Sequence, residues 1–260
     1  MGQLDGKVAL VTGSAHSIGK AIAIGFARQG ANVVLADKDV AAMNDVAKTI
    51  SGIGVQVEAV PTDVTEEKQI EALFAKAMER FNRLDILVNN AGLFYSASID
   101  EMTTEGWDRL INTGLRGSFL CTRAAFRIMK KQQAGRIINI GSISALRVRD
   151  KNAAYNTAKA GLIGLTHSTA LEGRQYGINC SIIHPGNVRQ DRMPPAGSPP
   201  PPRPANAAAN APARDPMRLE EMMGADELAA TVVYMASQPP HINIIEVVQV
   251  PREQPFLARG

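Results

Sequence analysis

Short apolar runs rich in β-branched residues recur along this chain, and longer stretches of helical character separate them. Near-continuous apolar strands that alternate with helices form a parallel sheet covered by helices on both faces. The sequence therefore predicts an α/β fold with a doubly wound parallel sheet in three layers, α/β/α, and ligands at the carboxyl ends of the strands. The expected strands are Val8–Val11, Val33–Ala36, Val55–Val60, Ile86–Val88, Ile137–Ile140, Ile178–Ile183 and Glu246–Val250, and the clearest helices are Ile18–Gln29 and Glu66–Phe81.

The stretch TGSAHSIG, residues 12–19, joins the first expected strand to the first helix. Gly13 permits a tight turn, and Gly19 permits close packing of the helix on the strand. The amides of the first helical turn, which opens at Ile18, point toward the loop and are suited to binding a pyrophosphate. Ser17 adds a small side chain with a hydroxyl donor. The spacing is not the general G-x-G-x-x-G, so an ordinary structural turn is the alternative.

Asp37 ends the second expected strand, in the sequence VVLAD. An acidic residue at this distance from the loop accepts hydrogen bonds from both hydroxyls of an adenosine ribose. The same carboxylate repels a 2′-phosphate, so Asp37 favours NAD over NADP. The alternative is a residue that caps a helix or closes a turn.

Tyr155 and Lys159 stand four residues apart, which places them on one face of a helix. A tyrosine titrates near pH 10, and lowering that pKa by about three units takes roughly 4 kcal/mol. The charge of Lys159, together with a positively charged nicotinamide, is expected to supply it. Tyr155 would then act as a general base toward an alcohol. For an isolated pair, an amphipathic helix with surface Tyr and Lys is the alternative.

From about residue 4 to residue 250 the chain resembles the short-chain dehydrogenase/reductase family. The resemblance implies one Rossmann-like NAD(P)-binding domain over residues 1–260, a parallel sheet of about seven strands, and a homodimer or homotetramer. The resemblance further implies that the subunits contact one another through the helices Glu105–Lys131 and Asn152–Gly173 and through the last strand and tail. The matching stretches, in the family's order and spacing, are TGSAHSIG, Asp37, Asp63–Val64, Asn89–Gly92, Asn112, Gly141–Ser142, Tyr155, Lys159 and Pro185–Gly186.

The resemblance also implies the role of each residue. Tyr155 is the acid/base, and Lys159 holds the nicotinamide ribose and lowers the phenol's pKa. Ser142 bonds the reacting oxygen, and Asn112 positions a water in a proton relay to Lys159. The implied cofactor-binding residues are Gly13, Ser17, Ile18, Gly19, Asp37, Asp63, Val64, Asn90, Ala91, Gly92, Tyr155, Lys159, Pro185, Gly186 and Val188.

Structural roles compete with some of these assignments. Asn89 is also suited to bracing neighbouring strands, and Asp63 to capping the helix that begins near Thr65. Ser142 is suited to bonding a local backbone group.

Two positions depart from the family pattern. Ser17 replaces the usual middle glycine of the loop, and Gln190 stands where a threonine commonly binds the nicotinamide carboxamide. Residues 194–216 hold nine of the 15 prolines, and the run Pro199–Pro202 cannot be helical. We interpret about 189–223 either as a substrate lid or as a surface linker.

Composition and charge limit the partners, the compartment and the metal sites that we expect. A net charge of +3 is too small to favour nucleic acid or an anionic membrane, and no apolar run is long enough to span a bilayer. Cys121 and Cys180 suit a reducing compartment as buried residues, so we expect a cytoplasmic protein. The four histidines (16, 167, 184 and 241) lack metal-ligand spacing, so no metal is expected.

The sequence thus predicts an NAD-dependent dehydrogenase that exchanges a hydride with a secondary alcohol or ketone. The alternatives are an NADP-dependent ketoreductase of the 3-oxoacyl-carrier-protein type and a catalytically idle NAD-binding sensor. An anionic substrate is one interpretation of five arginines, and surface solubility is the other. These arginines are Arg147, Arg149, Arg189, Arg192 and Arg203.

Overall fold

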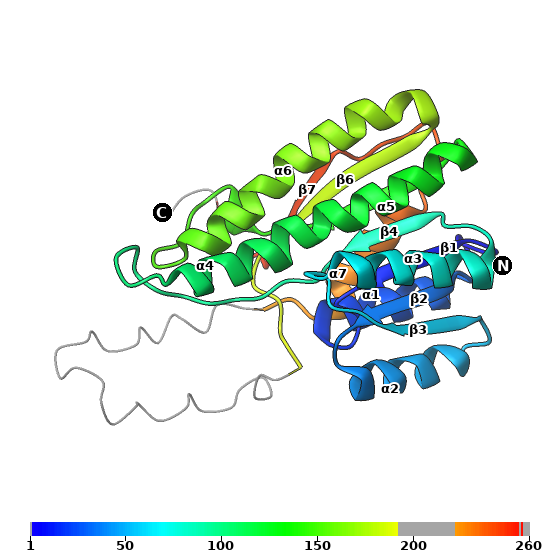
Figure 1. The fold of residues 1–260 in the computed structure, drawn as a ribbon, viewed down its shortest axis with the longest axis horizontal. Helices are drawn as coiled ribbons and strands as arrows, with labels where there is room; N and C mark the ends of the chain where they lie inside the picture. The colour runs from blue at the N-terminus through cyan, green and yellow to red at the C-terminus, as the bar shows by residue number, and fades with distance from the viewer. Residues whose placement is uncertain (1, 192–221, 255, 257–260) are drawn as a thin grey trace.

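The computed structural model describes residues 2–191, 222–254 and 256. Within them, seven parallel strands form one sheet in the order β3-β2-β1-β4-β5-β6-β7 (Figure 1). This confirms the predicted doubly wound fold. The strands are β1 Val8–Thr12, β2 Asn32–Asp37, β3 Val57–Pro61, β4 Ile86–Asn89, β5 Gly135–Ile140, β6 Ile178–Pro185 and β7 Glu246–Gln249.

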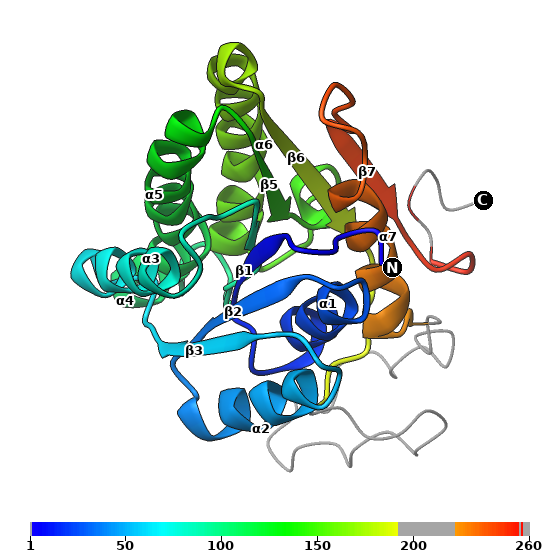
Figure 2. The same ribbon diagram turned by 90° about the vertical axis from the view of Figure 1, so that its right-hand side faces the viewer.

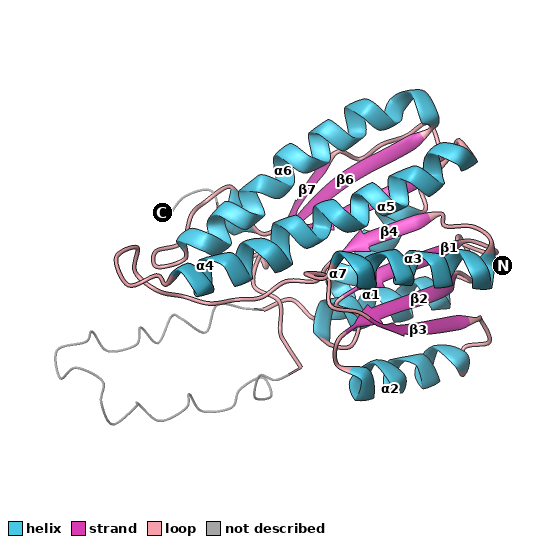
Figure 3. Ribbon diagram, in the orientation of Figure 1, coloured by secondary structure: helices cyan, strands magenta, loops and turns pink. Residues whose placement is uncertain are grey.

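Helices cover both faces of the sheet, and Figure 2 shows α3, α5 and α6 on the side opposite α1 and α2. The helices are α1 Ser17–Arg28, α2 Val40–Ser51, α3 Glu67–Phe81, α4 Thr104–Ile111, α5 Gly117–Gln132, α6 Ala153–Gly173 and α7 Ala225–Ala236. A π-helical turn, η1 (Asn112–Arg116), joins α4 to α5. Short 3₁₀ turns, η2 (Ile143–Ala145) and η3 (Arg174–Tyr176), flank α6. Figure 3 shows the helices and strands of this arrangement in separate colours.

The two cores follow from the alternation of side chains along the strands. In β1, Ala9 and Val11 pack with α1, α2 and α7. Val8 and Leu10 of the same strand point the other way and pack with α3 and α5. Because both faces are buried, the whole of β1 is apolar except its last residue, as a strand between two helical layers requires. Both cysteines are buried as free thiols, as predicted.

The expected element boundaries hold to within a few residues. The third strand begins at Val57, two residues later than predicted, because Gly54 at φ 100° extends the preceding turn. The predicted helix Glu105–Lys131 is α4, η1 and α5 in succession. Its middle turn is widened at Asn112, a departure that hydrophobic periodicity does not reveal.

The sheet order fixes where a ligand binds. The chain builds β1, β2 and β3 outward, then returns to place β4 on the other side of β1. At such a reversal the loops after the two neighbouring strands diverge and leave a crevice at their carboxyl ends. Gly13 follows β1 and Asn90 follows β4, so both border this crevice.

The predicted lid, about 189–223, lies mostly outside the described residues. Its described ends are side by side, because Val188 and Met223 form a parallel β-bridge. The amide of Arg189 donates to the Met223 carbonyl over 2.9 Å, and the amide of Met223 donates to the Asn187 carbonyl over 2.9 Å. Over the described part of the chain, no helix is both long and apolar enough to cross a membrane.

Candidate active site

The two loop glycines lie where no larger residue fits. Gly13 has φ +62°, and a Cβ there would lie 2.9 Å from Ala91 Cα. A Cβ on Gly19 would lie 2.0 Å from the Gly13 carbonyl oxygen. These two glycines therefore let the loop, the start of α1 and the segment after β4 approach one another closely. The arrangement leaves backbone, rather than side chains, facing the crevice.

Ser17 adopts an unusual conformation for a residue with a side chain, with φ +45°. It begins α1 and is buried. Its amide donates to Asp191 Oδ2 over 2.9 Å, and the amide of Asp191 donates to Ser17 Oγ over 2.9 Å. The sequence prediction placed a phosphate on this helix terminus, and the structure shows a carboxylate of the same chain against its first amide.

Asp37 lies at the end of β2, beside the glycine loop. Its Oδ2 accepts from the amide of Ala15 over 3.0 Å, and its Oδ1 accepts from the amide of Asp39 over 3.0 Å. These bonds hold the carboxylate beside the loop, at the point where the resemblance expects a ribose. The adjacent His16 Nε2 lies 2.8 Å from Asp39 Oδ2.

Asp63 closes the turn after β3. Its Oδ1 accepts from the amide of Thr65 over 2.9 Å and from Thr65 Oγ1 over 2.8 Å. Burial raises the pKa of Asp63, but the hydrogen bonds from Thr65 and the charge of Lys38 outweigh it, so this pKa lies below its usual value. These bonds close the turn before α3, whose N-cap residue is Glu66, so Asp63 does not cap that helix, and its role at the adenine stays a prediction. Its neighbour Val64 is buried and packs against Gly117.

The segment after β4 is fastened to β1. Asn90 Nδ2 donates to the carbonyls of Thr12 and Gly13, each over 2.9 Å, and the amides of Asn90 and Ala91 donate to Thr12 Oγ1. Gly92 follows, and a Cβ there would lie 3.8 Å from Lys159 Nζ. Asn90, Ala91 and Gly92 therefore span the distance from the glycine loop to Lys159.

Asn89 has the bracing role that was the alternative for it. Its Nδ2 donates to Asn139 Oδ1 over 2.8 Å and to Thr122 Oγ1 over 2.9 Å. Asn139 Nδ2 in turn donates to Thr166 Oγ1 over 2.8 Å. This buried network connects β4 and β5 to α5 and α6, so it fixes the strands beneath the site.

Ser142, Tyr155 and Lys159 meet at the carboxyl end of β5. Ser142 is the N-cap residue of η2, and its Oγ accepts from the amide of Ser144 over 3.1 Å. Hydrogen bonding with Ser142 also lowers the pKa of Tyr155. Lys159 lies one turn beyond Tyr155 on α6, with Nζ 5.8 Å from the centre of the Tyr155 ring. Its Nζ donates to the Ile140 carbonyl over 2.7 Å. The three side chains predicted to act together are thus neighbours.

Burial dominates the titration of this pair. It raises the pKa of Tyr155, and the hydrogen bond with Ser142 and the charge of Arg149 offset only part of that effect. Burial lowers the pKa of Lys159 to about 8. The sequence prediction of a lowered pKa for Tyr155 was made for a bound nicotinamide together with Lys159, and it stays a prediction. In the structure, the charge of Arg149 lowers this pKa.

Asn112 opens the π-helical turn, and its carbonyl accepts from the amide of Gly117, five residues on. The widened turn packs on α6, where a Cβ on Gly161 would lie 2.7 Å from Leu115 Cδ2. A π-turn leaves backbone groups out of the regular helical ladder, and such turns are frequent at functional sites. Asn112 is half-buried there.

The end of β6 carries Pro185, Gly186 and Val188. Gly186 accommodates the tail of the chain, because a Cβ on it would lie 2.1 Å from Gln254 Oε1. That same oxygen accepts from the amide of Asn187 over 2.7 Å. Gln190, at the position where a threonine is usual, donates from Nε2 to the Val188 carbonyl over 3.3 Å.

His184 lies beneath the site and is 0% exposed. Its Nδ1 donates to the Ser142 carbonyl over 2.9 Å, and its Nε2 lies 3.0 Å from Glu246 Oε1. His184 therefore holds the segment that carries Ser142.

Sequence reasoning missed the parts that Gln254, His184 and Asp191 play. Each contacts the site from a distant position in the chain, at separations of 67, 42 and 174 residues from their partners. No local motif surrounds any of them. Only the folded chain brings these side chains to the loops.

Of the five predicted arginines, Arg149 carries a charge that lowers the pKa of Tyr155. Its Nη2 donates to Asn187 Oδ1 over 3.0 Å. Arg147 is exposed. Arg192 and Arg203 lie outside the described residues.

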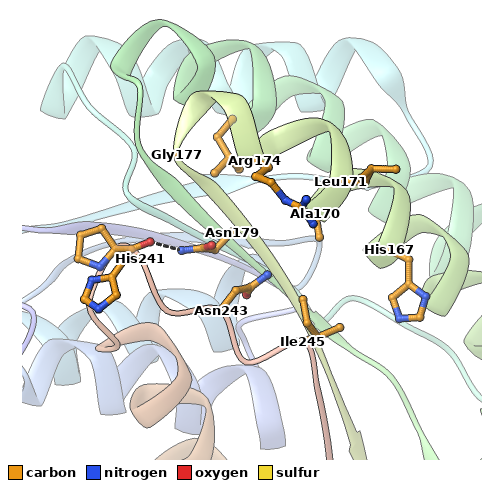
Figure 4. Close-up of a pocket in the computed structure, with 11 residues that line it drawn as sticks. His167, Ala170, Leu171, Arg174, Gly177, Asn179, His241, Asn243 and Ile245 are labelled. Atoms are coloured by element: carbon orange, nitrogen blue, oxygen red, sulfur yellow. Dashed lines mark hydrogen bonds between the residues drawn. The ribbon is translucent and has the colours of Figure 1, made fainter.

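A groove of about 680 Å³ lies elsewhere, at the amino end of β6 (Figure 4). The lining side chains come from the second half of α6, from η3, from the start of β6 and from the loop before β7, and include His167, Arg174, Asn179, His241 and Asn243. None of the predicted site residues lines it. The described ranges bring no three His, Cys, Asp or Glu side chains close enough to hold a metal ion, and the expectation of no metal stays a prediction.

Comparison with known proteins gives consistent matches. A family model described as short chain dehydrogenase matches residues 7–198. Uncharacterized oxidoreductase YxjF of Bacillus subtilis is 44% identical over 182 residues, 70% of this chain and 71% of that protein. The 3-oxoacyl-[acyl-carrier-protein] reductase of Synechocystis is 38% identical over 193 residues, 74% of this chain and 78% of that protein. The crystal structure of a metagenomic short-chain oxidoreductase in complex with NADP is 30% identical, with a TM-score of 0.79 over 96% of this chain and 98% of that one.

Proposed function

The chain belongs to the short-chain dehydrogenase/reductase family of oxidoreductases, and we propose that it exchanges a hydride between NAD and a secondary alcohol or ketone. The observation that carries this proposal is the grouping of Ser142, Tyr155 and Lys159 at the carboxyl end of β5. The glycine loop, Asp37 and the Asn90–Gly92 segment extend from these three residues along the crevice. Together they fit an extended dinucleotide.

The fit to a nicotinamide dinucleotide rests on backbone space as well as on polar groups. Gly13 and Gly19 let the loop, the start of α1 and the segment after β4 approach one another closely, and we infer that this brings the first amides of α1 near a bound pyrophosphate. Asp37 presents a carboxylate beside the loop, where it suits ribose hydroxyls. When bound, the nicotinamide accepts a hydride from an alcohol carbon or returns one to a carbonyl carbon.

The protein side chains manage the proton. Because burial raises the pKa of Tyr155, we infer that its hydroxyl is protonated at neutral pH. In carbonyl reduction it donates that proton to the oxygen that becomes the alcohol, while Ser142 donates a hydrogen bond to the same oxygen. In alcohol oxidation Tyr155 first releases its own proton, which passes toward solvent through Lys159 and the water at Asn112, and the charges of Lys159 and Arg149 stabilise the phenolate. The phenolate then takes the proton of the alcohol hydroxyl. Lys159 also holds the nicotinamide ribose, and Asn112 positions a water that belongs to a proton relay ending at Lys159.

The cofactor choice rests on Asp37, whose carboxylate repels a 2′-phosphate. The alternative is an NADP-dependent ketoreductase, favoured by the similarity to a 3-oxoacyl-[acyl-carrier-protein] reductase and to an oxidoreductase in complex with NADP. Initial rates with NAD(H) and NADP(H) at equal concentration distinguish the two. A higher kcat/KM with NADPH would reject the assignment to NAD.

We further propose that the substrate carries an anionic group. The charge of Arg149 lowers the pKa of Tyr155, and its guanidinium bonds Asn187 after β6, so this arginine is the candidate cation for a carboxylate or sulfonate on the substrate. Arg149→Met is expected to raise KM about tenfold for an anionic alcohol and to leave KM for its neutral analogue unchanged. Arg147→Met is the matched control. Equal effects of the Arg149 change on both alcohols would contradict the proposal.

The central experiment follows reduced-nicotinamide absorbance with a panel of polyols, sugars, hydroxy acids, sulfonated alcohols and steroids, in both directions. Tyr155→Phe is expected to lower kcat about 10³-fold and to leave NADH affinity unchanged. Tyr234→Phe, on the exposed face of α7, is the control. Tight NADH binding without Tyr155-dependent turnover would favour the sensor alternative instead.

We propose that residues 1–260 form one NAD(P)-binding domain that assembles into a homodimer or homotetramer through α4–α5, α6 and β7. Exposed apolar side chains on these elements support it, among them Phe119 of α5, Leu171 of α6 and Val248 of β7. Light scattering after size-exclusion chromatography measures the assembly. A monomer at micromolar concentration would refute it.

A further inference from the structure

The amino end of α1 lacks an anionic group of its own. The N-cap residue His16 makes no side-chain capping bond, and the first turn of the helix contains no acidic residue. A helix that begins in this way presents its first amides and the positive end of its dipole to any anion within reach. In the proposed complex that anion is the cofactor's pyrophosphate.

Asp191, 174 residues further along the chain than Ser17, supplies an anion to this position. Its Oδ2 accepts from the Ser17 amide over 2.9 Å and lies 3.5 Å from Lys20 Nζ, one turn into α1. Its own amide donates to Ser17 Oγ over 2.9 Å. The Asp191 carboxylate thus combines a hydrogen bond to the helix amide, an ion pair and the favourable end of the helix dipole.

Ser17 is matched to this contact. At φ +45° a residue with a Cβ is less favourable than glycine, so the serine costs conformational energy that a glycine would not. The serine adds a hydroxyl oxygen that accepts a hydrogen bond from the Asp191 amide. The departure from the usual glycine and the position of Asp191 are therefore two parts of one interaction.

From this geometry we infer that Asp191 is an internal competitor for the pyrophosphate site, and this inference rests on the proposed function. The Ser17 amide cannot bond the Asp191 carboxylate and a phosphate oxygen at once, and two anions at one helix terminus repel each other. Each cofactor molecule must displace Asp191 before its pyrophosphate binds α1. Asp191 therefore lowers the affinity for every ligand that carries the pyrophosphate, because only the displaced form of the protein is competent to bind.

The test compares wild type with Asp191→Asn and Asp191→Ala by isothermal titration calorimetry. The ligands are NADH and ADP-ribose, which contain the pyrophosphate, and adenosine, which contains no phosphate and is measured by competition. Asp45→Asn removes one carboxylate from an exposed pair on α2 and controls for net charge. Ser17→Gly removes the hydroxyl but keeps the carboxylate. Thermal melting of each variant verifies that it is folded.

Both Asp191 variants are expected to bind NADH and ADP-ribose about tenfold more tightly than wild type. Ser17→Gly should bind them about threefold more tightly, because it loses one of the two hydrogen bonds. Adenosine affinity, and all affinities of Asp45→Asn, should not change. Unchanged or weaker binding of ADP-ribose by the Asp191 variants would overturn the inference, since Asp191 would then be neutral or a ligand anchor.

The same data separate this inference from the proposed function. If all variants bind NADH with the same affinity, the cofactor assignment stands and the role of Asp191 is refuted. If neither wild type nor the Asp191 variants bind NADH or ADP-ribose, both are refuted. Binding by the Asp191 variants alone would support both.

Discussion

Lys159 is expected to destabilise the protein at neutral pH, so replacing it should raise the free energy of unfolding. Its side chain is 7% exposed, and burial lowers its pKa from 10.5 to about 8. A shift of that size corresponds to about 3 kcal/mol of unfavourable free energy for the buried ammonium. Lys159→Met removes this cost and also removes the hydrogen bond to the Ile140 carbonyl, worth about 1 kcal/mol. The variant should therefore be about 2 kcal/mol more stable at pH 7, although we expect it to be inactive.

The pH dependence gives a sharper test than the value at one pH. Below pH 8 the lysine is protonated in both the folded and the unfolded chain, so the full cost is present. Between pH 8 and pH 10.5 the folded protein has lost the proton and the unfolded chain retains it. The stability of the wild type therefore rises with pH in this window relative to Lys159→Met. The advantage of the variant should shrink by about 2 to 3 kcal/mol between pH 7 and pH 10.

Urea denaturation of cofactor-free protein, followed by circular dichroism at pH 7, 8, 9 and 10, measures this difference. Taking the difference between two proteins cancels the titration of all other groups, including Tyr155, unless Lys159 is coupled to them. Lys48→Met is the control, because Lys48 is largely exposed on α2 and pairs only with its helix neighbour Asp45 among the contacts described. A difference between wild type and Lys159→Met that stays constant from pH 7 to pH 10 would refute a burial-depressed lysine.

Three other changes test the loop, the core and the cofactor choice. Gly19→Ala places a Cβ 2.0 Å from a loop carbonyl oxygen. It should weaken NADH binding, measured by fluorescence titration, at least about 30-fold. The control Gly164→Ala, whose Cβ meets nothing within 4 Å, should leave NADH binding unchanged. Asn139→Ala breaks the buried network and should lower the free energy of unfolding in urea by about 3 kcal/mol, against less than about 0.5 for exposed Asn44→Ala. Asp37→Ala should raise the ratio of kcat/KM for NADP over NAD at least about tenfold; an unchanged ratio would show that Asp37 does not face the 2′ position.

The sequence predicted the sheet because its strands are apolar on both faces, a pattern that only a sheet between two helical layers satisfies. The resemblance to a known family predicted the group of Ser142, Tyr155 and Lys159, and helix spacing by itself predicted only that the last two are neighbours. Tyr155 and Lys159 are neighbours in any helix that contains both. The boundaries that differed, such as the start of β3, depend on turn conformations that composition does not specify.

The tertiary structure alone decided the features that depend on distant segments. The pKa of Tyr155 is raised because the surrounding elements shield its side chain from water. That shielding is a property of packing rather than of local spacing. The contact of Asp191 with Ser17 joins residues 174 positions apart. Local periodicity and motif spacing encode which residues share an element. Solvent exclusion and long-range hydrogen bonds arise only when those elements pack, so the sequence determined the chemistry available to this site and the fold decided its electrostatics.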